Sequence, residues 1–268
     1  MPHVARKRFG QNFLVDRSVI DRIVEAIDPR PGDCLVEIGP GTGALTEPLI
    51  PALGGAPLQV IELDRDLVGR LRRRFDAGQL IVHEADALEF DFAALAQSGK
   101  RLRVVGNLPY NISSPLLFHL LRYAECIRDQ HFMLQKEVVL RMVAQPGGRV
   151  YGRLSVMLQV RYRMELLFVV RPEAFLPAPK VDSALVRMIP LAGAELAVRD
   201  PSVFSAVVAH AFSTRRKMLR NALADFDERV PLAEYGLEPT ARAEEIAPAL
   251  YVAYANALAA NSLRDSTP

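Results

Sequence analysis

Short apolar runs that alternate with helical patterns restrict the fold of this chain more than any other feature of its sequence. The runs at residues 34–38, 58–62, 80–82, 102–105 and near 131–135 have the length of buried strands, and apolar side chains with helical spacing lie between most of them. Parallel strands need such crossovers, which are right-handed. The pattern predicts an α/β fold with a mostly parallel sheet covered by helices on both faces.

The last hundred residues follow a different pattern. Residues 166–170 and 184–189 are apolar runs joined by a proline-rich segment without helical spacing, which predicts an antiparallel hairpin at one edge of the sheet. Only helical patterns follow, at residues 203–212, 214–224 and 248–260. We therefore expect two domains: residues 1–192, which form the sheet, and residues 193–268, which form a small all-helical domain.

Three glycines, Gly39, Gly41 and Gly43, follow the first predicted strand and open the next helix. A backbone without side chains can approach a ligand closely and can turn tightly into a helix N-terminus. The spacing is G-x-G-x-G, with Glu37 before the first glycine, whereas a dinucleotide site uses G-x-G-x-x-G. The loop therefore indicates a ligand site of another kind.

Two acidic residues follow the next strands. Glu62 ends the second predicted strand, where a carboxylate can accept hydrogen bonds from both hydroxyls of a ribose. Asp86 comes just after the third strand and can accept the exocyclic amine of an adenine, although a helix-capping role explains it nearly as well. No G-x-x-x-x-G-K-[ST] motif favours ATP. An adenosine site without a phosphate-binding lysine indicates S-adenosylmethionine as the cofactor.

The segment Asn107-Leu-Pro-Tyr110 follows the fourth strand, at the edge where open α/β sheets bind ligands. Methylating an exocyclic base nitrogen is difficult because its lone pair is delocalised into the ring. The Asn107 side-chain carbonyl and the Leu108 backbone carbonyl can accept the two amine protons and aim the lone pair. Pro109 fixes the backbone, and Tyr110 offers a ring on which a base can stack. The alternative is an ordinary proline turn with a buried tyrosine.

Charge and cysteine content limit the kinds of partner and the cellular compartment that we expect for this chain. Residues 101–191 carry 13 basic and 6 acidic side chains in a chain whose net charge is only +2, which favours a polyanionic partner over a chance excess of arginine. The two cysteines, Cys34 and Cys126, are far apart, which argues against a disulfide scaffold or a zinc module. No apolar run reaches the roughly 20 residues that span a bilayer. We expect a cytoplasmic protein without a metal or a membrane partner.

Eight motifs in order make the sequence recognisable. They are Lys7–Leu14, Glu37–Gly41, Val60–Asp64, Asn107–Ser113, His131–Glu137, Tyr151–Ser155, Phe175–Ser183 and Phe212–Asn221. Together they cover nearly the whole chain and resemble the ribosomal RNA adenine N6-dimethyltransferases, in particular the bacterial small-subunit branch associated with kasugamycin sensitivity. The resemblance implies a Rossmann-like class I methyltransferase sheet, with the helical domain binding rRNA.

The resemblance also implies roles for individual residues. The cofactor-binding positions are Asn12, Leu14, Gly39, Gly41, Glu62, Asp86 and Asn107. The catalytic positions are Asn107, Leu108, Pro109, Tyr110 and Phe175. Asn107 would touch both the cofactor and the target amine, and the rings of Tyr110 and Phe175 would enclose the target adenine.

The substrate implied by the resemblance is a pair of adjacent adenosines in the 3′-terminal hairpin loop of 16S rRNA, methylated late in the assembly of the 30S subunit. The RNA-binding positions are Lys7, Arg8, Arg215, Arg216, Lys217 and Arg220, for which a solvated basic face is the alternative. We expect a monomer.

Two other functions remain open. One is the related large-subunit rRNA dimethylase that confers macrolide resistance, although Leu108 and the segment Phe212–Lys217 favour the small-subunit type. The other is an assembly factor whose binding, rather than its methylation, is the main role.

Overall fold

The computed structural model describes residues 11–96, 99–191, 197–214 and 217–264. The chain divides into two compact units. The first comprises Met1–Val139 and Met164–Pro190, and the second comprises Leu140–Arg163 and Leu191–Pro268. Residues 140–163, which the predicted boundary near 193 assigned to the sheet domain, thus belong with the C-terminal helices. The reason is that the helix in this segment packs against helices of the last 70 residues.

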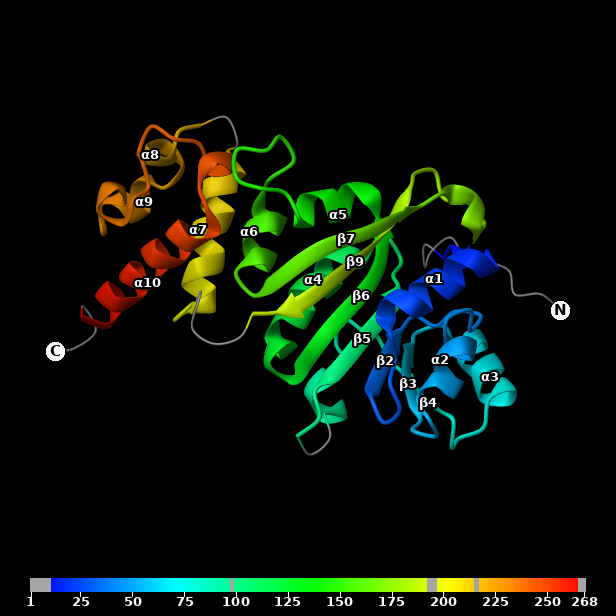
Figure 1. The fold of residues 1–268 in the computed structure, drawn as a ribbon. Helices are drawn as coiled ribbons and strands as arrows, with labels where there is room; N and C mark the ends of the chain where they lie inside the picture. The colour runs from blue at the N-terminus through cyan, green and yellow to red at the C-terminus, as the bar shows by residue number, and fades with distance from the viewer. Residues whose placement is uncertain (1–10, 97–98, 192–196, 215–216, 265–268) are drawn as a thin grey trace. The chain divides into compact units, whose positions relative to one another are not determined.

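A seven-stranded sheet forms the centre of the first unit, in the order β4-β3-β2-β5-β6-β9-β7 (Figure 1). The strands are β2 (Cys34–Ile38), β3 (Leu58–Glu62), β4 (Leu80–Glu84), β5 (Leu102–Asn107), β6 (Ile127–Gln135), β7 (Tyr162–Val170) and β9 (Ser183–Pro190). Neighbours from β4 to β6 are parallel, and β9 is antiparallel to β6. The predicted α/β class is confirmed. Of the two late strands, β9 lies beside β6, and β7 forms the edge.

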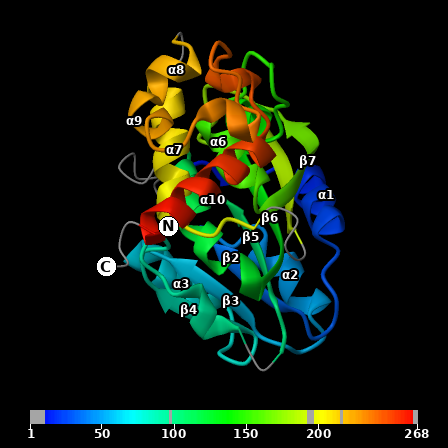
Figure 2. The same ribbon diagram turned by 90° about the vertical axis from the view of Figure 1, so that its left-hand side faces the viewer.

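Three helices join successive parallel strands: α2 (Thr46–Ala52), α3 (Arg65–Arg74) and α4 (Ser113–Leu120). Helix α1 (Arg17–Ile27) precedes β2, and α5 (Lys136–Met142) follows β6. Helix α3 lies beside β3 and β4 (Figures 1 and 2), and α2 packs against β3. Apolar side chains of α1, α2 and α3 share one buried cluster with residues of β2, β3 and β4. This cluster fixes the strand ends from which the loops of the site begin.

The start of α1 is set by Asp16, whose side chain accepts the backbone N–H groups of Ser18 and Val19. The other end of α1 meets a buried arginine. Arg103 of β5 donates to the backbone carbonyls of Ile27 and Asp28, which the end of the helix leaves without helical partners.

The same Arg103 side chain joins two carboxylates. Its Nε lies 3.0 Å from Asp129, and its Nη1 lies 2.7 Å from Asp33. Burial acts to raise the pKa of Asp129, but the neighbouring His131 and Arg103 outweigh it and hold that pKa below its ordinary value. The network ties α1, β5 and β6 together at the amino ends of the strands, whereas the predicted site is at their carboxyl ends.

A small second sheet is formed by two-residue strands far apart in the sequence. Strand β1 (Phe13–Leu14) pairs antiparallel with β8 (Phe175–Leu176), with Phe13 opposite Leu176 and Leu14 opposite Phe175. This pairing ties the segment around Asn12 to the proline-rich loop after β7.

The second unit is helical. Its elements are α6 (Arg153–Gln159), α7 (Pro201–Ser213), α8 (Leu219–Ala222), α9 (Ala224–Asp227) and α10 (Pro248–Arg264). Three buried tyrosines donate their hydroxyls to backbone carbonyls: Tyr151 to Ile246, Tyr251 to Ala243 and Tyr254 to Val230. These bonds satisfy the polar ends of large core side chains.

The predicted continuous helix over residues 214–224 is wrong. Met218 has an extended backbone and forms a bridge with Arg242. The N–H groups of Leu219 and Arg220 donate to the carbonyls of Ala241 and Pro239. Because another segment takes these donors, only the short helices α8 and α9 form here.

Candidate active site

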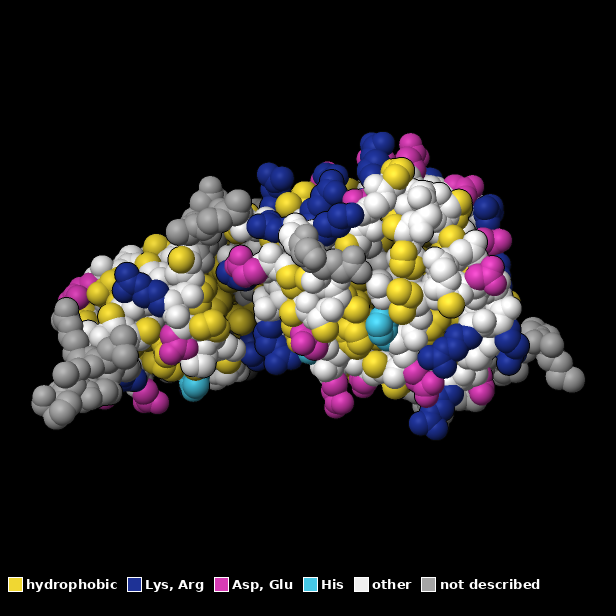
Figure 3. Space-filling model, turned by 90° about the horizontal axis from the view of Figure 1, so that it is seen from below, with side chains coloured by type: hydrophobic (Ala, Val, Ile, Leu, Met, Phe, Trp, Pro, Cys, Tyr) yellow, Lys and Arg dark blue, Asp and Glu magenta, His cyan; other side chains and the backbone are white. Residues whose placement is uncertain are grey.

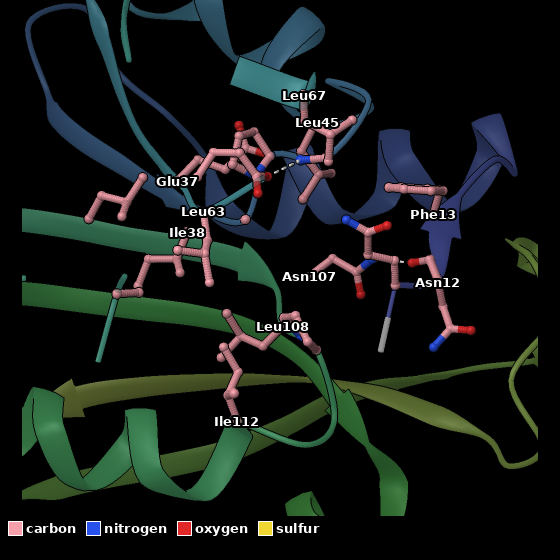
Figure 4. Close-up of a pocket in the computed structure, with 18 of the residues that line it drawn as sticks. Asn12, Phe13, Glu37, Ile38, Leu45, Leu63, Leu67, Asn107, Leu108 and Ile112 are labelled. Atoms are coloured by element: carbon pink, nitrogen blue, oxygen red, sulfur yellow. Dashed lines mark hydrogen bonds between the residues drawn. The ribbon is translucent and has the colours of Figure 1, made fainter. Parts of the chain in front are cut away.

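One pocket lies at the carboxyl ends of β2, β3 and β5, where the strand order reverses (Figure 4). Five segments line it: the β1 segment, the glycine loop after β2, the end of β3, the loop after β4 and the turn after β5. All of them belong to the first unit. This is the place at which open α/β sheets bind their ligands.

The glycine loop has the conformation that its sequence predicts. Gly39, Gly41 and Gly43 have φ values of 66°, 58° and 90°, in the region that side chains other than glycine rarely adopt. A Cβ atom on Gly41 would lie 3.1 Å from the ring of Phe13, whereas one on Gly39 would meet nothing within 4 Å. The loop thus packs against β1 on one side and leaves open space beside Gly39.

Glu62 is buried at the end of β3 and lines the pocket. Its carboxylate accepts the N–H of Gly41 at 3.2 Å and that of Asp64 at 2.8 Å. Burial raises the pKa of this carboxyl, and these two bonds together with one from the Leu63 backbone oppose the shift. A carboxylate has about four acceptor positions, so capacity remains for a hydroxyl group of a ligand.

A second buried carboxyl, Glu37, lies beside the first. Thr46 donates its hydroxyl to Glu37 at 2.6 Å. Burial raises the pKa of Glu37 to about 7; the Thr46 bond opposes this shift and the charge of Glu62 adds to it. A cation bound nearby would favour the ionised form of Glu37. In the sequence, Glu37 stands out only as the acid that precedes the glycine motif.

The loop after β4 and the residue after Glu62 complete this wall. Asp86 lines the pocket and accepts the N–H of Leu88 at 2.8 Å, so it also caps the local turn, as its alternative interpretation requires. Leu63 lines the pocket too, with 49 % of its surface exposed, and was missed. Its position directly after the strand-ending acid is the signal that indicates it. The side chain supplies an apolar surface for a flat ring.

These features fit S-adenosylmethionine, the expected cofactor. The glycine loop leaves backbone space beside Gly39, Glu62 presents acceptors for ribose hydroxyls, and Leu63 offers an apolar surface for the adenine. Two carboxyl groups near the same pocket suit a ligand that carries a sulfonium and an ammonium charge.

Asn107 ends β5 on the opposite wall. Its amide Nδ2 donates to the backbone carbonyl of Asn12 at 2.9 Å (Figure 4). Because the amide nitrogen is held by Asn12, the amide oxygen is directed away from it. A Cβ on Gly106 would lie 2.6 Å from the carbonyl oxygen of Ile38, so only glycine lets β5 approach β2 this closely.

The turn after Asn107 is rigid. The N–H of Leu108 donates to the Met133 carbonyl at 3.1 Å, and the Pro109 carbonyl accepts both the Ile112 N–H and the Ser113 hydroxyl. Tyr110 lines the pocket, and its hydroxyl lies 2.6 Å from that of Ser183. The segment is therefore a proline turn whose tyrosine faces the pocket.

The structure brings together ten of the predicted site residues. Asn12, Leu14, Gly39, Gly41, Glu62, Asp86, Asn107, Leu108, Pro109 and Tyr110 all line the pocket. Phe175 does not line it, because its ring is 3 % exposed and packs in the core beside Leu14.

Of the predicted RNA-binding residues, Lys217 and Arg220 are exposed in the second unit. Lys7, Arg8, Arg215 and Arg216 lie outside the described residues. Basic and acidic side chains are interspersed on the face seen in Figure 3. Within the described part of the chain, no group of three His, Cys, Asp or Glu side chains is arranged to hold a metal ion, and no helix is long and apolar enough to cross a bilayer.

Comparison with known proteins agrees with a methyltransferase site. A family model, "Ribosomal RNA adenine dimethylase", matches residues 3–260. The chain is 60 % identical over 257 residues to a protein of Cupriavidus metallidurans named ribosomal RNA small subunit methyltransferase A, covering 93 % of this chain and 91 % of the relative. It is 59 % identical over 262 residues to a protein of the same name from Burkholderia lata, covering 96 % and 95 %.

Solved structures share the fold. A dimethyladenosine transferase from Plasmodium falciparum, 23 % identical, has a TM-score of 0.78 and covers 93 % of this chain and 98 % of its own. The 23S rRNA methyltransferase ErmE, 26 % identical, has a TM-score of 0.68 with 92 % and 100 % covered. The chain therefore belongs to the ribosomal RNA adenine dimethylase family, enzymes that dimethylate rRNA adenine with S-adenosylmethionine as the methyl donor.

Proposed function

We propose that this enzyme dimethylates the N6 amines of two adjacent adenosines in the 3′-terminal hairpin loop of 16S rRNA. The substrate is the 30S subunit or its late precursor, and the enzyme acts in the cytoplasm as a monomer. The observation that carries the proposal is the Asn107 amide, which the Asn12 carbonyl fixes at 2.9 Å at the pocket that Tyr110 also lines. The relatives at about 60 % identity, named for the small subunit, support this subunit over the large one.

The first wall of the pocket would hold the cofactor. When bound, S-adenosylmethionine supplies a methyl group on a sulfonium, which leaves without help from an acid or a base. Gly39 gives it backbone space and Gly41 lets the loop pack against Phe13, while Glu62 accepts the ribose hydroxyls and Asp86 accepts the adenine amine. Asn12 and Leu14 close the pocket from the β1 side.

The second wall would hold the target base. The oxygen of Asn107 and the backbone carbonyl of Leu108 accept hydrogen bonds from the N6 amine, so the nitrogen lone pair is localised and aimed at the methyl group. Tyr110 stacks on the flipped adenine. With Phe175 packed beside Leu14, its contribution in this arrangement is to support β1, which carries the Asn12 carbonyl.

The exposed cations of the second unit would contact rRNA phosphates. Lys217 and Arg220 are candidates among the described residues. In this proposal the first unit carries the transfer site and the second unit contributes RNA binding.

A direct test offers radiolabelled S-adenosylmethionine with unmethylated small subunits, and with large subunits in parallel. Nuclease digestion and chromatography then identify the labelled base. We expect dimethyladenosine in 16S rRNA alone. Label only in 23S rRNA would assign the enzyme to the macrolide-resistance branch, and no label in either subunit would favour the assembly-factor alternative.

Replacing Glu62 with alanine is expected to weaken S-adenosylmethionine binding by roughly 100-fold, because hydrogen bonds to a charged acceptor contribute about 1.5–3 kcal/mol each. Calorimetric titration measures the effect. Affinity for the small subunit should stay within about threefold, since Glu62 is at the cofactor wall. Glu84→Ala is the matched control, because Glu84 ends the adjacent strand and pairs with Arg65 and Arg72 on the surface. Equal loss of cofactor and RNA affinity in the Glu62 variant would contradict the assigned role.

A further inference from the structure

The hydroxyl groups of Tyr110 and Ser183 lie 2.6 Å apart, although the two residues are 73 positions apart in the sequence. Tyr110 belongs to the turn after β5, and Ser183 is the first residue of β9. Both belong to the first unit. Ser183 is completely buried and is not one of the residues that line the pocket. Its side chain therefore reaches the reaction only through the tyrosine.

Ser183 is held rigidly from both sides. It lies opposite Gln135 in the antiparallel pairing of β6 and β9. The next pair along is held by two bonds: the Lys136 N–H donates to the Asp182 carbonyl at 3.0 Å, and the Lys136 Nζ lies 3.3 Å from the Asp182 carboxylate. Because Ser183 is carried by a paired strand, it cannot follow the Tyr110 hydroxyl if the tyrosine side chain swings away.

The other end of Tyr110 is fixed as well. The Ser113 hydroxyl lies 3.1 Å from the Tyr110 carbonyl and 3.1 Å from that of Pro109, which holds the backbone of the turn. Rotation about the bond next to the ring leaves the tyrosine hydroxyl in place, so fixing the backbone and the hydroxyl fixes the direction of the ring axis. Burial raises the pKa of the Tyr110 phenol, which keeps it neutral.

We propose that Ser183 is a positioning residue for methyl transfer: its hydroxyl sets the direction of the Tyr110 ring axis and thereby the position at which the target adenine stacks and presents its N6. The inference rests on the proposed role of Tyr110 in stacking the base. Geometry of this kind acts on the rate of the step itself, because displacement of about 1 Å can cost roughly 100-fold in rate.

The test measures kcat and KM for unmethylated small subunits in four variants: Ser183→Ala, Tyr110→Phe, the double variant and Tyr110→Ala. Ser183→Ala and Tyr110→Phe should each lower kcat by roughly tenfold to a hundredfold, with KM within about threefold. The double variant should lose no more than either single one, because both substitutions break the same bond. Rates are expressed per cofactor-binding site, counted by titration, so that a misfolded fraction does not appear as a lower kcat.

Ser155→Ala is the matched control. Ser155 is also a completely buried serine, and its hydroxyl donates to the backbone carbonyl of Arg141 in the second unit. It reports the general cost of losing a buried serine hydroxyl, and its kcat per site should equal that of the unmodified enzyme.

The outcomes distinguish the positioning role of Ser183 from the stacking role of Tyr110. If Tyr110→Ala slows transfer while Ser183→Ala and Tyr110→Phe retain full kcat, the positioning role is overturned and the stacking role stands. If Tyr110→Ala itself leaves kcat unchanged, the stacking role fails and the positioning role fails with it. Independent, multiplying losses in the double variant would also overturn the proposal.

Discussion

Replacing Asn107 with alanine is expected to slow methyl transfer by roughly 100-fold to 1000-fold, the range found when one preorganised hydrogen-bonding group is removed from a reaction centre. The Asn12 carbonyl holds the amide nitrogen at 2.9 Å and so turns the amide oxygen away from Asn12; in the proposed mechanism this oxygen accepts a hydrogen bond from the incoming amine. Without that oxygen the N6 lone pair stays delocalised. Single-turnover methylation of small subunits at saturating cofactor measures the change.

A second substitution at the same position separates the acceptor from its orientation. Asn107→Asp keeps an acceptor oxygen but loses the donor to Asn12, so a carboxylate then faces a carbonyl. We expect its rate to fall as well, by at least tenfold. Asn256→Ala is the control, because the Asn256 amide also bonds to backbone groups, those of Arg199 and Ala197, and does not line the pocket. An Asn107→Ala rate within threefold of the unmodified enzyme would refute the role of the amide.

Replacing Arg103 with methionine is expected to lower the free energy of unfolding by about 3–5 kcal/mol, because breaking a buried ion pair leaves uncompensated charge in the interior. Asp33 and Asp129 would lose their common partner, and the carbonyls of Ile27 and Asp28 would lose a donor. The thermal midpoint should fall by roughly 10 °C. Denaturant titration followed by circular dichroism measures the loss.

Arg128→Met is the matched control for this prediction. Arg128 pairs with the same carboxylate of Asp33, at 3.3 Å, but 58 % of its side chain is exposed. Exposed pairs contribute less than about 1 kcal/mol, so this variant should unfold almost as the unmodified protein does. Equal losses in the two arginine variants would show that burial does not set the energy of the network.

The cost of Arg103→Met should also depend on pH. The pKa of Asp129 is lowered in the folded protein, so its ionised form stabilises the fold at every pH above the ordinary carboxyl value. That contribution disappears as the pH falls through the lowered value. The two unfolding curves should therefore converge in acid.

The sequence predicts the strands of this fold well where they are buried on both faces. β2 and β3 begin and end at the predicted residues, because parallel central strands have continuous apolar runs bounded by turn residues. β6 begins at Ile127, four residues before the predicted run, because Arg128, Asp129 and Gln130 interrupt its apolar pattern. The Arg103 partner that accommodates Asp129 comes from another strand, which no local pattern reveals.

The same distinction applies to the site. Glu62, Asp86 and Asn107 can be predicted because the carboxyl ends of parallel strands meet at one edge of the sheet. The pairing of β1 with β8 cannot, since each strand has two residues and about 160 positions separate them. That pairing is what buries Phe175 and brings the Asn12 carbonyl to Asn107. Ser183 escapes prediction for the same reason, because its partner is set by the register of β9.

The reversal of strand order between β2 and β5 also decides which parts of this enzyme are free to diverge. The acids and glycines that suit the methyl donor come from β2, β3 and β4, whereas Asn107 and Tyr110 follow β5 and are supported from β9. A descendant can therefore acquire a new RNA target through substitutions on one side while it inherits the donor site intact. The two sides join at Gly106, where any added side chain would collide with Ile38. We therefore expect position 106 to remain glycine whichever side of the pocket changes.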